Sequence, residues 1–339
     1  MKDEGRPAKL KDIAERLGIS VATVSRALQA NPAISRQTRE LVMQTARDMN
    51  YTKNIIADSL RSGSLPVIGV IVPHGVTHFY SSVLDGIEHI AASAGYAVVN
   101  INSHERYVEE YANVRDLANL HVAGIIASVT QETADFSHFG SLMAGGIPVV
   151  FVARDIPMQT YSSVTADGAE AARRATHHLI KQGCRRIAIL CGPSRLKMVA
   201  DRKHGYIEAL REYGLPLRPC YVAYSDIDSA SAVDATDTLL DLNECPDGII
   251  ALNDTLLFSA MKTIKRRGLS MPSDIALIGF SDAEYAADVC PTLSTIEDRS
   301  RLMGESAAQI LLNHIRGDMT PVRKVISTVQ RIRQSSRRK

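Results

Sequence analysis

Near the N-terminus, apolar residues recur every three or four positions in two short segments separated by a glycine. Residues 10–17 place leucine, isoleucine and alanine on one face and charged side chains on the other, which is typical of an amphipathic helix. Gly18 then ends this helix, because glycine adopts the left-handed conformation freely. Ser20 can cap a second helix over residues 21–28, whose apolar face can pack on the first. The pattern predicts a helix-turn-helix.

The side chains that the second helix leaves outward suit the major groove of DNA. Arg26 can bond a guanine edge with two hydrogen bonds, and Val21 and Ala22 can rest on thymine methyl groups. Thr23 and Ser25 can donate to phosphates. The alternative is a solvent-facing helical bundle in which Arg26 is an ordinary solvated charge. Helices this short are unstable alone, which favours the DNA-binding interpretation. The complete outward set is Val21, Ala22, Thr23, Ser25, Arg26 and Gln29.

A third helix and a possible linker follow this pair. Ser35 can cap a helix whose apolar residues recur on one side through Met49, which completes a three-helix head. Residues 55–61 are compatible with a helix of about two turns, which is too short to be stable alone in water, so we expect them to be disordered unless DNA holds them. Residues 62–66, which contain glycine, two serines and a proline, are the natural domain boundary.

From Val67 onward, apolar runs of strand length alternate with amphipathic runs of helix length. This rhythm is typical of β-α-β units in a parallel sheet, and a second series of the same kind begins near residue 166. Two doubly wound units predict two lobes, with a cleft where the carboxyl ends of their strands face each other. The expected fold is therefore α/β, with an all-α head and a two-lobed body resembling periplasmic binding proteins. The expected strands are 67–72, 96–101, 124–128, 147–152, 186–190, 248–251 and 275–279.

Charge is distributed unevenly between the two parts. The residues up to Gly63 hold 11 Lys and Arg against 7 Asp and Glu, a net charge of +4, whereas the rest holds 28 against 30, a net charge of −2. A basic head on a nearly neutral body is what a DNA-binding module attached to a sensor should show.

Several classes of protein are disfavoured by what the sequence does not contain. No signal peptide or stretch of about 18 apolar residues is present, so we expect a cytoplasmic protein, associated with the nucleoid when bound to DNA. The 5 cysteines show no C-x-x-C spacing and the histidines no metal-ligand spacing, which predicts no disulfide framework, metal site or cofactor. The nucleotide-binding and nucleophile motifs are absent, so we do not expect an enzyme. A transport receptor is opposed by the basic head and the missing signal peptide.

Several motifs together resemble the LacI/GalR (lactose-repressor/galactose-repressor) family of bacterial transcriptional regulators. The head carries three of them, Leu10–Ala14, Ser20–Arg26 and Asn50-Tyr51, with a Val-Ala pair similar to the galactose-repressor branch. The resemblance continues in the body at Arg202 before Gly205-Tyr206, at Asn253-Asp254, at Ile278–Phe280 and at Leu293–Ile296.

The resemblance implies a homodimer on a pseudopalindromic operator, with a small-molecule effector between the lobes. It places Tyr51 at the DNA-binding surface and makes residues 55–61 a hinge helix whose Leu60 wedges into the minor groove. The alternative to this wedge role is that Leu60 is a linker residue that packs on the body. Lys53 stands where the family has a proline, so the entry to the hinge can differ. The expected domains are a head of residues 1–62 and a body of residues 66–334, with lobe 1 at 66–164 and 296–323 and lobe 2 at 165–295 and 324–334.

Strand ends and family motifs together predict the residues that contact the effector. Arg202 is the strongest, because a guanidinium can clamp hydroxyls, a carboxylate or a phosphate with two bonds. Asn253 offers both a donor and an acceptor for a hydroxyl. The alternative for Phe79, Met198 and Ile227 is an ordinary place in the core. The predicted set is Phe79, Tyr80, Ser128, Arg154, Met198, Arg202, Ile227, Asn253, Ser281 and Asp282.

Two departures from the family bear on the effector. Sugar-binding relatives have an acidic residue directly after the Gly-aromatic pair, where this chain has Ser281 and then Asp282. A second commonly acidic position is Ala153 beside Arg154. With fewer carboxylates and two arginines, the cleft favours an anionic or phosphorylated ligand over a neutral sugar. A sugar, sugar phosphate or related molecule is therefore expected, and a global regulator controlled mainly by a phosphoprotein is the alternative.

Overall fold

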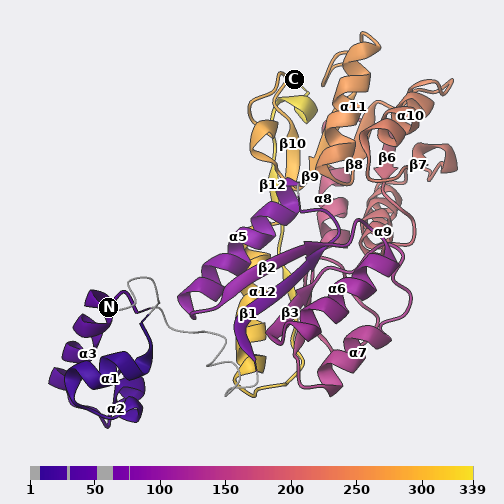
Figure 1. Ribbon diagram of the computed structural model, residues 1–339. Helices are drawn as coiled ribbons and strands as arrows, with labels where there is room; N and C mark the ends of the chain where they lie inside the picture. The colour runs from indigo at the N-terminus through magenta and orange to yellow at the C-terminus, as the bar shows by residue number, and fades with distance from the viewer. Residues whose placement is uncertain (1–7, 29–30, 52–63, 76, 339) are drawn as a thin grey trace. The chain divides into compact units, whose positions relative to one another are not determined.

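The computed structural model describes residues 8–28, 31–51, 64–75 and 77–338 and divides the chain into two compact units between Gly63 and Ser64 (Figure 1). Unit 1 contains α1 (Leu10–Leu17), α2 (Val21–Leu28) and α3 (Arg36–Asp48). Their buried side chains form one small core made of Ile13, Ala14, Val24, Ala27, Val42 and Ala46.

The local signals at the helix ends act in unit 1 as the sequence indicates. Gly18 follows α1 with φ 65, the left-handed conformation. The Ser20 hydroxyl accepts a hydrogen bond of 3.1 Å from the Thr23 amide, and Ser35 accepts one of 3.2 Å from the Thr38 amide. These serines satisfy amide groups that the first turn of each helix leaves without partners.

Unit 2 contains two parallel sheets, and the first sheet forms lobe 1. Its strand order is β11-β5-β4-β3-β1-β2, and all of its neighbouring strands are parallel. Alternate side chains of the central strands enter two different cores, one with α5 and α12 and the other with α6 and α7, so these helix pairs cover opposite faces. The elements are β1 (Leu65–Val72), α5 (His78–Ser93), β2 (Ala97–Asn102), α6 (Tyr107–Asn119), β3 (Val122–Ala127), α7 (Ser137–Ala144), β4 (Val149–Val152), β5 (Ser162–Ala166), α12 (Ser300–Ile315) and β11 (Arg323–Ile326).

The second sheet forms lobe 2, with the strand order β12-β10-β9-β8-β6-β7. Only β12, at the edge, is antiparallel among the described strands of this sheet. Helix α8 packs against α9, and α10 packs against α11. The elements are α8 (Gly168–Lys181), β6 (Ile187–Cys191), α9 (Lys197–Glu212), β7 (Val222–Tyr224), α10 (Ser229–Leu240), β8 (Gly248–Ala251), α11 (Asp254–Arg266), β9 (Ala276–Phe280), β10 (Ser294–Glu297) and β12 (Val329–Arg331), with short 3-10 turns at Pro219–Tyr221, Glu284–Ala286 and Gln334–Ser336.

The last crossing between the lobes differs from the sequence prediction. Residues 324–334 were expected in lobe 2, yet β11 pairs with β5 in the sheet of lobe 1, with Val325 opposite Thr165. The side chain of Ile326 is buried in the core of lobe 1, which holds the strand there. The chain therefore returns to lobe 2 after Ile326, a few residues later than expected. The strand β10 likewise keeps residues 296 and 297 in lobe 2.

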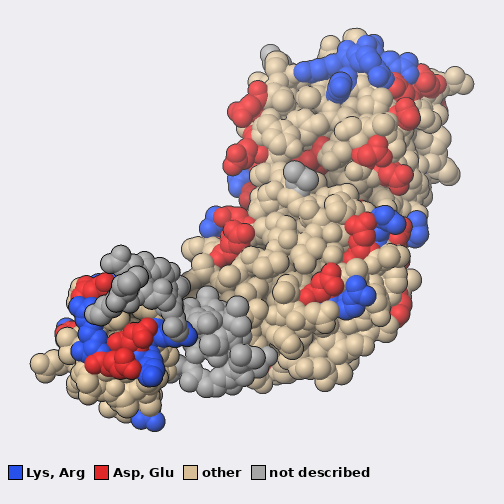
Figure 2. All heavy atoms as spheres, viewed as in Figure 1, with Lys and Arg blue, Asp and Glu red and all other residues tan. Residues whose placement is uncertain are grey.

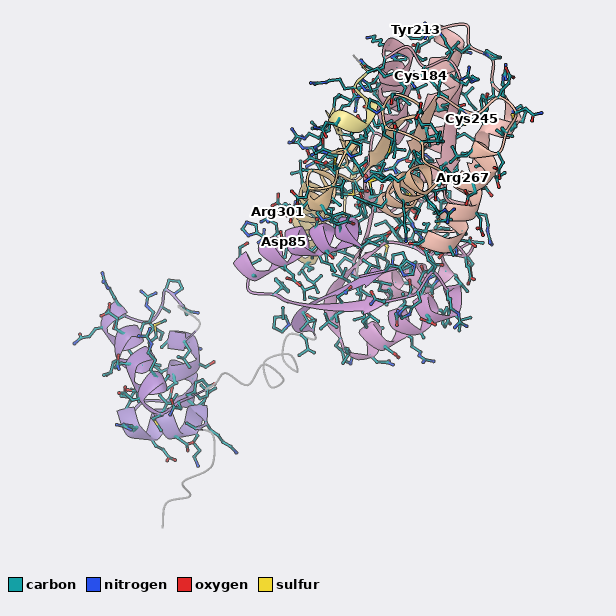
Figure 3. The ribbon with its side chains drawn as sticks, turned by 90° about the horizontal axis from the view of Figure 1, so that it is seen from above. Asp85, Cys184, Tyr213, Cys245, Arg267 and Arg301 are labelled. Atoms are coloured by element: carbon teal, nitrogen blue, oxygen red, sulfur yellow. The ribbon has the colours of Figure 1, made fainter. Side chains whose placement is uncertain are left out.

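Helices that are distant in the sequence meet closely in both lobes. In lobe 1, Asp85 on α5 forms an ion pair with Arg301 on α12, and Figure 3 shows the two side chains next to each other. In lobe 2, Gly205 lets α9 approach α8, because a Cβ at this position would stand 1.9 Å from the carbonyl oxygen of Ala169. The glycine thus sets the position of the helix that carries Met198 and Arg202.

Gly205→Ala is expected to lower the free energy of unfolding by roughly 1–3 kcal/mol, because the added methyl group forces α8 and α9 apart. Urea denaturation followed by circular dichroism measures the change. Gly140→Ala is the matched control, because a Cβ there in α7 would meet only the Tyr161 hydroxyl, at 3.3 Å. Equal losses in the two variants would contradict the close contact of α8 with α9.

Candidate functional site

In unit 1, the outer face of α2 presents most of the predicted DNA-contacting residues to solvent. Val21 is 43% exposed, Ala22 and Arg26 are exposed, and Thr23 and Ser25 are half-buried. Tyr51 is half-buried and packs against the core of unit 1, so the structure gives it a packing contact in addition to its predicted role. Gln29 and Leu60 lie outside the described residues. Figure 2 shows basic and acidic side chains together on this unit, so charge alone does not mark the contact face.

In unit 2, most of the predicted effector residues line a single cavity between the lobes. Lobe 1 contributes residues from the start of α5 and the end of β4, and lobe 2 contributes residues from α9 and from the loops after β7, β8 and β9. The cavity therefore lies at the carboxyl ends of strands of both sheets, where doubly wound sheets bind ligands. The predicted residues that line it are Phe79, Tyr80, Arg154, Met198, Arg202, Ile227, Asn253 and Ser281.

The other two predicted residues do not line this cavity. Ser128 is completely buried, and its hydroxyl lies 2.9 Å from the Tyr80 hydroxyl, so it supports a cavity residue from behind. The Asp282 carboxylate accepts hydrogen bonds of 2.6 Å from both Thr295 and Arg333, and it faces a separate cavity. The structure thus places Ser128 and Asp282 outside the cavity that the other predicted residues line, and direct effector contacts of these two residues stay a prediction.

Arg154 is held by a carboxylate that the sequence did not reveal. Its guanidinium donates to the two carboxylate oxygens of Glu105 at 2.8 and 2.5 Å and to the carbonyl oxygen of Val129 at 2.7 Å. Burial by itself would raise the pKa of Glu105, but the hydrogen bonds and charge of Arg154 outweigh burial, and this pKa is lowered. Both residues belong to lobe 1, so this ion pair does not join the two lobes.

Arg202 has a similar arrangement in lobe 2. It donates to the two carboxylate oxygens of Asp298 at 3.0 and 3.2 Å and to the carbonyl oxygen of Leu252. The guanidinium carbon lies 4.0 Å from the centre of the Phe280 ring, a stacked cation–π geometry. Arg202 is 3% exposed and Asp298 is 1% exposed, and burial raises the pKa of Asp298 despite the neighbouring guanidinium.

These pairs remove the reason to expect an anionic ligand. The sequence indicated two free guanidinium groups in the cleft, but each already binds a carboxylate with two hydrogen bonds. Glu105 and Asp298 were missed, although Asp298 directly follows β10 and Glu105 lies in the short loop after β2, which ends at Asn102. The strand-end rule that selected Ser128 and Ser281 could have found them as well.

The backbone is strained where two strands enter the cavity. Ala153, directly after β4, has φ 68, and Ser281, directly after β9, has φ 85. Left-handed conformations are costly for residues with a Cβ and concentrate at functional sites. Corresponding positions of both lobes thus turn the chain sharply at the cavity wall, which directs the loops that follow them toward the ligand space.

A second cavity of about 360 Å³ adjoins the first. Phe79, Met198, Arg202 and Asp298 line both cavities, which therefore meet at these residues. The volume of the second cavity falls in the range of small-molecule sites. Within the described ranges, no group of His, Cys, Asp and Glu side chains is arranged to hold a metal ion.

The sequence comparisons identify both units. Residues 9–54 match the family described as bacterial regulatory proteins, lacI family, and residues 176–336 match a periplasmic binding protein-like domain. The probable HTH-type transcriptional repressor ExuR of Bacillus subtilis is 30% identical over 334 residues, which cover 97% of this chain and 98% of that protein. The chain belongs to the lacI family. As a lacI-family protein, it is a DNA-binding transcriptional regulator with a helix-turn-helix head and a ligand-binding body.

Other members of the lacI family agree in sequence and in fold. Catabolite control protein A of Priestia megaterium is 30% identical over 90% of this chain and 91% of its own length. The lac repressor dimer bound to operator and the anti-inducer ONPF has a TM-score of 0.85, with 25% identity, over 97% of this chain and 99% of that chain. The regulator CelR in complex with cellobiose has a TM-score of 0.74, with 28% identity, over 97% of this chain and 100% of that chain. The relatives named here are transcriptional regulators rather than enzymes.

Among the described residues, no helix combines the length and the apolar character needed to cross a bilayer.

Proposed function

We propose that this lacI-family regulator represses transcription in the cytoplasm as a homodimer on a pseudopalindromic operator. One short recognition helix, α2, reads too few bases for specific binding, and a two-fold dimer doubles them. The exposed positions of Val21, Ala22 and Arg26 support α2 as the base-reading element. Residues 55–61, including Leu60, are proposed to link the head to the body as the hinge.

The effector of this repressor is proposed to be a small hydroxylated molecule, a sugar or sugar derivative, bound between the lobes. The observation that carries this proposal is the cavity walled by buried charged side chains, Arg154 from lobe 1 and Arg202 from lobe 2. A ligand that touches both lobes favours one arrangement of them, so it changes the populations of the two states that differ in operator affinity. Sugar ligands of structural relatives, such as cellobiose in the CelR complex, support the same class.

Control mainly by a phosphoprotein is not favoured. A regulator of that type needs an outer docking surface, and it does not need buried ion pairs around an internal cavity. If a phosphoprotein were the main regulator, the residues that line the cavity would have only a structural role.

The purified full-length protein is expected to bind an operator, selected from random duplexes, as a dimer and with no added partner. A sugar that binds the body should change operator affinity by the same factor by which operator changes sugar affinity, because the two equilibria are linked. Sedimentation and fluorescence anisotropy titrations measure these quantities. A monomer that binds a half-site tightly, or operator binding that requires a second protein, would contradict the proposal.

A further inference from the structure

Asp254 is a buried carboxyl group at the effector cavity that forms no ion pair within the described residues. It is the first residue of α11, lines the cavity and is 9% exposed. Its Oδ1 atom is shielded from solvent and has no hydrogen-bond partner in the described part of the chain. Burial, together with the nearby carboxylates of Asp298 and Asp282, raises its pKa to about 7, although a hydrogen bond from the backbone amide of Ala283 and the charge of Arg202 act in the opposite direction.

The other carboxylates that line the two joined cavities all have cationic partners. In the first cavity, Glu105 and Asp298 are paired with the two arginines described above. In the adjoining cavity, the Nζ atom of Lys197 lies 3.3 Å from a carboxylate oxygen of Asp155 and 2.8 Å from one of Asp201. Asp167 and Glu170 lie within ion-pair distance of Arg174 and Arg173, respectively. Among the residues that line this space, Asp254 alone is a carboxyl without an ion pair.

Two residues that line the same cavity also carry a buried donor without a partner. The Nε atoms of Arg154 and Arg202 are buried and have no hydrogen-bond partner within the described residues, although the other nitrogens of both guanidinium groups are bonded. Buried polar groups normally find partners, so three unsatisfied atoms at one cavity indicate the chemistry that a ligand must bring. The two Nε–H groups require acceptors, and Asp254 requires a donor.

We infer, building on the proposed effector site, that the effector is a hydroxylated amine of monosaccharide size whose ammonium group binds the Asp254 carboxylate. Without a partner, burial drives the Asp254 carboxyl toward its protonated form, and an ammonium group supplies the counter-charge that stabilises the ionised form. Hydroxyl oxygens accept from the Nε–H groups of Arg154 and Arg202, whose own charges are already neutralised. Among the described residues that line this space, every arginine and lysine is already paired with a carboxylate, and an anionic ligand is repelled by the ionised form of Asp254.

The experiment uses the full-length protein at pH 7 and isothermal titration calorimetry with two matched series of sugars. Glucosamine, glucose and glucuronate form one series, and galactosamine, galactose and galacturonate form the other. The amine of one series is expected to bind on the order of tenfold or more tighter than its neutral counterpart, because hydrogen bonds to charged groups are the strong ones. The anionic member of that series should bind most weakly.

Asp254→Asn is expected to abolish the preference for the amine, since the amide has a similar shape without the charge. Glu284→Gln is the matched control, because it removes an exposed carboxylate next to Ala283 without touching the cavity, and it should keep the preference. Urea denaturation followed by circular dichroism reports whether the body of each variant remains folded, since unit 1 has a core of its own.

Several outcomes would overturn the inference. Tighter binding of a neutral or anionic member would refute the amine assignment and leave the proposed effector site intact. Equal loss of preference in Asp254→Asn and Glu284→Gln would mean that the general negative field, rather than Asp254, selects the ligand. Binding by none of the six sugars would refute the inference as stated, while the operator titrations described above test the proposed function separately.

Discussion

Arg202→Ala is expected to cost about 3–5 kcal/mol of unfolding free energy, because it leaves Asp298 buried without its counter-charge. The loss includes the stacking on Phe280 and the bond to the Leu252 carbonyl oxygen. Urea denaturation of the full chain measures it. The variant should lose its response to effector, and below its unfolding transition it should keep operator binding without effector, because unit 1 has its own core.

A second variant separates the loss of the ion pair from general damage to the cavity wall. Arg202→Met combined with Asp298→Leu removes both charges, and it should recover much of the stability, since replacing both partners of a buried pair by apolar groups is far less costly than removing one. It should still fail to respond to effector. A loss below about 1 kcal/mol for Arg202→Ala would show that the pair is solvated and that its burial is wrongly assigned.

Arg26→Ala is expected to weaken binding to the cognate operator by roughly 1–3 kcal/mol, the worth of a bidentate contact with guanine. Binding to random duplexes should barely change, because Arg26 is proposed to read a base. Anisotropy titrations at one fixed salt concentration measure both affinities. The fixed concentration is necessary because contacts to phosphates depend strongly on salt.

Arg47→Ala is the control for this prediction, since Arg47 is an exposed arginine on α3 rather than on α2. It should leave the ratio of cognate to random binding unchanged. Equal weakening of cognate and random DNA by Arg26→Ala would mean that Arg26 contacts a phosphate, and the assignment of base reading would have to be withdrawn.

Features that depend on neighbouring residues could be predicted from the sequence alone. The three helices of unit 1 follow from apolar spacing and from end signals such as Gly18, Ser20 and Ser35, which act within one helical turn. The alternation of strands and helices in the body depends in the same way on local apolar runs. The fold class was therefore predicted correctly, as the two parallel sheets and the family match show.

Features that depend on pairing between distant residues were decided by the tertiary structure. Arg154 and Glu105 are 49 residues apart, and Arg202 and Asp298 are 96 apart, so no local periodicity links either pair. Parallel sheets bring the ends of distant strands to one edge, and only this placement shows that both arginines are occupied and that Asp254 is not. The position of β11 in lobe 1 has a related cause. This edge strand has four residues, and its lobe is decided by its pairing with β5 and by the burial of Ile326 in the core of lobe 1.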